Sequence, residues 1–116
     1  MEKARKKELL AEFRQTRPAA GVYRIVNRQT GRALLASTEN LQVVRNRLDF
    51  AQSSKGTSLL DRRLVKDARE QGIEVFALEV LEVLEVTPEM TDAQVKADLA
   101  ALESLWREKQ DQALAY

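Results

Sequence analysis

The feature that most constrains the fold is a pair of short apolar segments separated by a turn, within residues 21–38. The first segment, VYRIV at residues 22–26, combines β-branched and aromatic side chains, which favour a strand. The next five residues, NRQTG, are turn formers, and RALLAS at residues 32–37 can return antiparallel to the first segment. The pattern predicts a β-hairpin and, with it, an antiparallel sheet.

The segment before the hairpin has the composition of a helix. Residues 2–16 are good helix formers with apolar side chains toward one side, and Pro18 prevents easy continuation. We therefore expect an N-terminal helical extension over residues 1–18, followed by one domain over residues 19–116. The apolar side chains of the extension are Leu9, Leu10 and Phe13.

A helix is predicted directly after the hairpin. Ser37 or Thr38 can cap its N-terminus, because a side-chain hydroxyl can accept a hydrogen bond from a free backbone N–H there. Leu41, Val44 and Leu48 then recur at helical spacing, which places them on one face. This face is expected to pack against the sheet.

A further helix and a third strand follow. Ser58 with Asp61 is expected to cap a helix that ends at Gly72. The stretch EVFALEVLEVLEV, residues 74–86, is rich in Val and Leu and predicts a strand. Its glutamates at positions 79, 82 and 85 recur every three residues, a spacing that fits neither the strand period nor the helix period.

A long helix is predicted at the end of the chain, after a capping box formed by Thr91 and Gln94. The expected element order is α-ββ-α-α-β-α. This order predicts an α+β fold in which helices flank a small antiparallel three-stranded sheet. The expected buried stripe of the last helix consists of Val95, Leu99, Leu102 and Trp106.

Composition excludes several kinds of chemistry. The 116 residues contain no cysteine, so the chain has no disulfide and no thiolate metal site. They contain no histidine, the usual general base near neutral pH, so any catalysis would have to use Tyr, Lys, Arg, Asp or Glu. No apolar run approaches the roughly 20 residues that cross a bilayer, and the basic N-terminus lacks the apolar core of a signal peptide. We therefore expect a cytoplasmic protein without a membrane partner.

The near-neutral net charge of +1 hides a strong asymmetry. Residues 1–69 contain 16 Lys/Arg and 7 Asp/Glu, whereas residues 70–116 contain 3 Lys/Arg and 11 Asp/Glu. This split is compatible with a basic surface for polyanions, with ends that attract one another within or between molecules, or with ordinary solvated surfaces.

Five short motifs occur in a fixed order: GVY at 21–23, LLA at 34–36, S-x-x-N-L at 37–41, GIEVFALEVLE at 72–82 and ESLW at 103–106. Together they resemble the GIY-YIG nuclease superfamily from Gly21 to Trp106, with LLA in place of the second signature. The resemblance implies a small antiparallel sheet with helices packed around it, which agrees with the element order above.

The resemblance also implies which residues would carry catalysis. In the family, the glutamate that corresponds to Glu103 holds one divalent metal, Mg²⁺ or Mn²⁺, and a tyrosine from each signature handles water and hydrogen bonds. An arginine on the first core helix faces the phosphate, and some members add a histidine one turn beyond it. Tyr23 and Glu103 remain here, whereas Leu34, Val44 and Leu48 stand at the second tyrosine, arginine and histidine positions.

Two arginines lie near the substituted position 44. Arg45 is adjacent and can take the arginine role only if the helix is shifted by one residue. Arg47 lies about 60° from Val44 around the helix, so it can approach the same groove from its edge. Either arginine is therefore a candidate residual site residue.

The sequence favours a nuclease-like domain that has lost catalysis and serves as a binding or assembly module, with no cofactor. Its apolar groove would contact a protein segment or a second copy of the chain, unless the N-terminal helix fills the groove. One alternative is nucleic-acid binding by the basic front half. The other is a divergent metal-dependent DNA endonuclease that uses Tyr23, Glu103 and Arg45 or Arg47, with Mg²⁺ or Mn²⁺ at Glu103.

Overall fold

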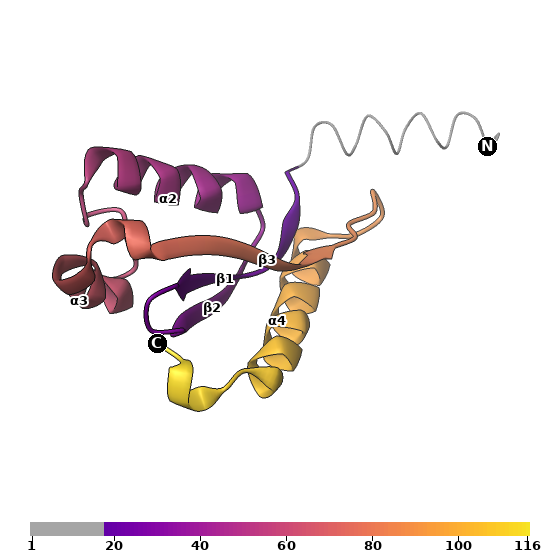
Figure 1. Cartoon of the computed structure of the whole chain (residues 1–116). Helices are drawn as coiled ribbons and strands as arrows, with labels where there is room; N and C mark the ends of the chain where they lie inside the picture. The colour runs from indigo at the N-terminus through magenta and orange to yellow at the C-terminus, as the bar shows by residue number, and fades with distance from the viewer. Residues whose placement is uncertain (1–17) are drawn as a thin grey trace.

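The computed structural model describes residues 18–116, so the expected N-terminal helix lies outside the described residues. Three antiparallel strands form one sheet in the order β2-β1-β3 (Figure 1). They are β1 (Ala20–Asn27), β2 (Ala33–Thr38) and β3 (Phe76–Leu84). The predicted hairpin and the third strand are both confirmed, and the fold is α+β.

Helices cover both faces of the sheet. Alternate residues of β1 point to opposite faces, and Ile25 packs with Leu48 and Leu64, whereas Ala20 packs with Val95 and Leu99. The first face therefore lies against α2 and α3, and the second against α4 (Figure 1). The helices are α2 (Leu41–Ser54), α3 (Arg62–Gln71) and α4 (Asp92–Lys109), with short 3₁₀ turns η1 (Ile73–Val75) and η2 (Gln112–Leu114).

The start of α2 differs from the prediction. Asn40, and not Ser37 or Thr38, is the N-cap, and its side-chain oxygen accepts a hydrogen bond from the Val43 backbone N–H at 3.2 Å. The two hydroxyl residues belong to β2, which remains extended through Thr38. Because they end the strand, they do not reach the N-cap position of α2, which begins at Leu41.

The start of α3 also lies later than expected. Asp61 caps the helix alone by accepting from the Arg63 N–H at 2.9 Å, so the predicted contribution of Ser58 is wrong. The predicted end is confirmed, because Gly72 closes the helix with a φ of 95°, a conformation that favours glycine.

A β-bulge explains the three-residue spacing between Glu79 and Glu82, while Glu85 lies beyond the end of β3. Tyr23 pairs with Val80 but Val22 pairs with Glu82, so β3 contains one extra residue, Leu81. The extra residue shifts the side-chain alternation and brings Glu79 and Glu82 to the same face. Arg24 binds Glu79 on this face at 2.9 and 3.0 Å, and Glu82 accepts from the Trp106 indole N–H at 2.8 Å.

The predicted capping box of α4 is confirmed, but its buried stripe is shorter than expected. Val95 and Leu99 are buried, whereas Leu102 and Trp106 are only half-buried. Trp106 lies at the edge of the sheet, with its indole against Glu82 and the Lys109 ammonium 4.9 Å from its ring centroid. None of the described helices is long and apolar enough to cross a membrane.

The segment after α4 covers the outer edge of β2. Ala115 forms a parallel bridge with Ala33, and the Tyr116 N–H donates to the Ala33 carbonyl at 3.2 Å. The Tyr116 hydroxyl donates to Asp67 at 2.6 Å and accepts from buried Asn27 at 3.0 Å. This cluster ties the end of the chain to β1 and α3.

Candidate functional site

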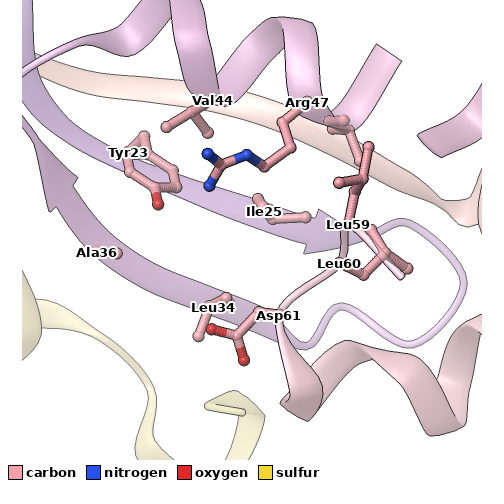
Figure 2. A pocket seen from close by; sticks show the side chains of 10 residues that line it. Tyr23, Ile25, Leu34, Ala36, Val44, Arg47, Leu59, Leu60 and Asp61 are labelled. Atoms are coloured by element: carbon pink, nitrogen blue, oxygen red, sulfur yellow. The ribbon is translucent and has the colours of Figure 1, made fainter. Parts of the chain in front are cut away.

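A cleft of about 240 Å³ opens on the α2 face of the sheet. The β1–β2 hairpin forms its floor, α2 forms one wall, and the loop before α3 closes one end (Figure 2). Its lining residues are Tyr23, Ile25, Leu34, Ala36, Val44, Arg47, Leu48, Leu59, Leu60 and Asp61.

Leu34, Val44 and Leu48 meet in this cleft. Leu34 and Leu48 are buried and belong to the main core, while Val44 is half-buried on the α2 wall. Tyr23 lies beside them on β1. The positions where the resemblance implies a tyrosine, an arginine and a histidine thus form one continuous aliphatic surface.

Arg47, and not Arg45, accompanies Tyr23. Figure 2 shows the Arg47 side chain extending from α2 into the cleft toward Tyr23. Arg45 instead lines a separate hollow with Arg28 and Glu74, on the β3 side of α2. Of these two arginines, Arg47 is the one placed to contact a group bound in the cleft.

The Tyr23 hydroxyl is held in its neutral form. Burial raises the pKa of Tyr23, and the negative charges of Asp61 and Glu103 raise it further. The positive charges of Arg47 and Arg63 act in the opposite direction without reversing the shift. Tyr23 can therefore donate a hydrogen bond into the cleft, but it does not supply a phenolate near neutral pH.

Glu103 lies on the opposite face of the sheet. It projects from α4 and accepts from the Ser37 hydroxyl at 3.0 Å and from the Arg107 guanidinium at 2.8 Å. Burial opposes its ionisation, but the hydrogen bonds from Arg107 and Ser37 outweigh burial and lower the pKa of Glu103. Glu103 is ionised and close enough to affect Tyr23, although it does not line the cleft.

Comparison with known proteins identifies the architecture. No family model and no curated protein matches the sequence. A solved structure of the catalytic domain of intron endonuclease I-TevI, in a glutamate-to-alanine mutant form, matches with a TM-score of 0.60 at 16% identity. The match covers 84% of this chain and 91% of that chain. The fold is GIY-YIG-like. At this level of identity the likeness shows the fold alone.

The GIY-YIG-like fold raises the question of a divalent metal at Glu103. Oε1 of Glu103 already accepts from Ser37, and Oε2 is paired with Arg107. Nowhere within residues 18–116 do three potential metal-ligating side chains come together. The described residues therefore do not build a metal site around Glu103.

One charged residue of the cleft, Asp61, was not among the predicted site residues. Asp61 lines the cleft, and Arg63 binds its two carboxylate oxygens at 2.9 and 3.0 Å. The side-chain hydrogen bond from Arg63 is the main reason why the pKa of Asp61 is lowered. Capping signals placed Asp61 near the start of α3, but nothing local in the sequence shows that this helix start meets the hairpin.

Proposed function

We propose that this chain is a GIY-YIG-like module that binds nucleic acid through its phosphate backbone and does not cleave it efficiently. The observation that carries the proposal is the meeting of Leu34, Val44 and Leu48 in the cleft that also holds Tyr23 and Arg47.

The aliphatic surface argues against efficient hydrolysis. Cleavage of a phosphodiester requires polar or charged groups that stabilise the pentacoordinate phosphorus, and loss of one such group commonly costs about 10²–10³ in rate. Aliphatic side chains at all three positions cannot donate hydrogen bonds or supply positive charge. The neutral Tyr23 hydroxyl and Arg47 remain, and both can bind a phosphate without activating water.

The surroundings of the cleft favour a polyanion. The two helices on this face, α2 and α3, carry six Lys/Arg and three Asp/Glu. One of the three acids, Asp67, is buried beneath Tyr116 and does not face solvent. The basic residues are Arg45, Arg47, Arg62, Arg63, Lys66 and Arg69.

The binding half of the proposal is tested by titrating a fluorescent DNA duplex and a single strand at several salt concentrations. We expect binding that weakens as salt rises, since phosphate contacts release counterions. Arg47→Ala should weaken binding by about tenfold, as expected for loss of one charge-assisted contact. Arg45→Ala is the matched comparison, because it removes the same charge two residues away but outside the cleft, and it should weaken binding less than Arg47→Ala. Absence of binding even at low salt would reject nucleic acid as the ligand.

One observation favours a second candidate, a divergent metal-dependent endonuclease. Tyr23 and Glu103 are both kept at family positions, and the negative charge of Glu103 adds to the effect of burial and Asp61 in raising the pKa of Tyr23. A metal that displaced Arg107 from Glu103 would have to recruit most of its ligands from water and substrate. This candidate requires cleavage that depends on both the metal and Glu103.

A further inference from the structure

Another hollow, here called the acidic groove, lies between the end of β3 and α4. Its volume is about 420 Å³, and its polar lining consists of acidic side chains beside a floor of aliphatic residues. The lining residues are Glu82, Val83, Leu84, Glu85, Asp98, Ala101 and Leu102. From these features we infer that the acidic groove binds the basic N-terminal segment of this same chain, residues 1–17. This inference does not depend on the proposed function.

The sheet register places the groove next to the point where that segment enters the domain. Ala20, the first residue of β1, pairs with Leu84, which lines the groove. Ala20 also packs against Val95 and Leu99 of α4, so the chain enters on the α4 side of the sheet. Seventeen residues would span roughly 25 Å even as a helix, so the segment can reach the whole groove.

Charge complementarity selects this segment. Residues 1–17 contain six Lys/Arg and three Asp/Glu, while the groove is lined by three acids and no basic residue. The cleft on the other face is less suited to bind this basic segment, because α2 and α3 carry an excess of positive charge. The acidic groove of a second copy of the chain would not bind here, because two acidic surfaces repel each other. Residues 70–116, which form the groove, carry 3 Lys/Arg against 11 Asp/Glu.

The apolar side chains are also complementary. Leu84 and Leu102 line the groove, and Leu105, farther along α4, is 53% exposed. The N-terminal segment brings Leu9, Leu10 and Phe13 within five residues of one another. Contact between these groups would remove apolar surface from water on both sides.

The absence of cysteine permits a direct test on the full chain. A nitroxide attached to Ala11→Cys should broaden the amide NMR signals of Val83, Ala101 and Leu102, while Phe50 on α2 should keep its intensity. Asp98→Lys should reduce this broadening, because it replaces a groove acid with a positive charge. Asp49→Lys, which makes the same change on α2, is the matched control and should have no effect.

Mixing nitroxide-labelled chain with unlabelled ¹⁵N chain separates contacts within one molecule from contacts between molecules. The inference predicts no broadening of the ¹⁵N chain in this mixture. Broadening that appears in the mixture, or that centres on Tyr23 and Arg47, would overturn it. Unchanged groove signals in the singly labelled chain would also overturn it.

Discussion

Three aliphatic side chains determine what the cleft can do. Leu34 and Leu48 are part of the main core, so polar side chains at these positions would have to enter the interior. Val44 is different, because it is half-buried on the wall of the cleft and its side chain has access to solvent. Packing therefore favours an apolar side chain at positions 34 and 48, whereas position 44 can accept a polar one.

Val44→Arg tests this view of the cleft. The substitution places a guanidinium beside Arg47, and we expect nucleic-acid affinity to rise by up to about tenfold as one phosphate contact is gained. Val43→Arg is the matched control, because Val43 is 42% exposed on α2 but does not line the cleft. Equal gains for both variants in the DNA titration would show that general charge, and not the cleft, controls binding.

Within residues 18–116, local sequence patterns predicted each strand and α-helix. They did not predict where α2 and α3 begin or how β3 pairs with β1. The hairpin, the third strand and the α4 capping box follow from residue types that act within a few positions. The β3 bulge does not, because it depends on how Leu81 is accommodated opposite β1. The caps at Asn40 and Asp61 were displaced for a similar reason, since the preceding segments are held by tertiary packing.

Gly21 is tied to the bulge, and its substitution tests the β1–β3 register. A Cβ at this position would overlap the backbone carbonyl oxygen of Glu82. Because backbone must shift to make room, Gly21→Ala should lower the free energy of unfolding by about 1–3 kcal/mol. In Gly56→Ala the nearest atom to the new Cβ would be the Ser54 hydroxyl at 3.5 Å, so urea denaturation should show little change. Similar denaturation curves for both variants would contradict this register.

At the scale of the molecule, basic helices surround one hollow and acidic side chains line another, on the two sides of the sheet. The basic helices α2 and α3 surround the cleft, while β3 and α4 form the acidic groove. The charge split is visible in the sequence itself. The meeting of Leu34 with Val44 and Leu48 was expected only from the family resemblance, because spacing alone places Val44 and Leu48 on one helix face and says nothing of Leu34. The sequence did not predict that Glu103 faces away from the cleft or that Asp61 lines it, since both depend on how distant elements pack.

The central claim is that the GIY-YIG-like cleft binds nucleic acid without cleaving it efficiently. The most direct measurement is cleavage of plasmid and oligonucleotide DNA with Mg²⁺ or Mn²⁺, at protein concentrations where the same samples show binding. Glu103→Ala is assayed beside the unaltered chain. We expect salt-sensitive binding and no cleavage above the level of Glu103→Ala. Metal-dependent cleavage that disappears in Glu103→Ala would contradict the claim and establish a divergent nuclease.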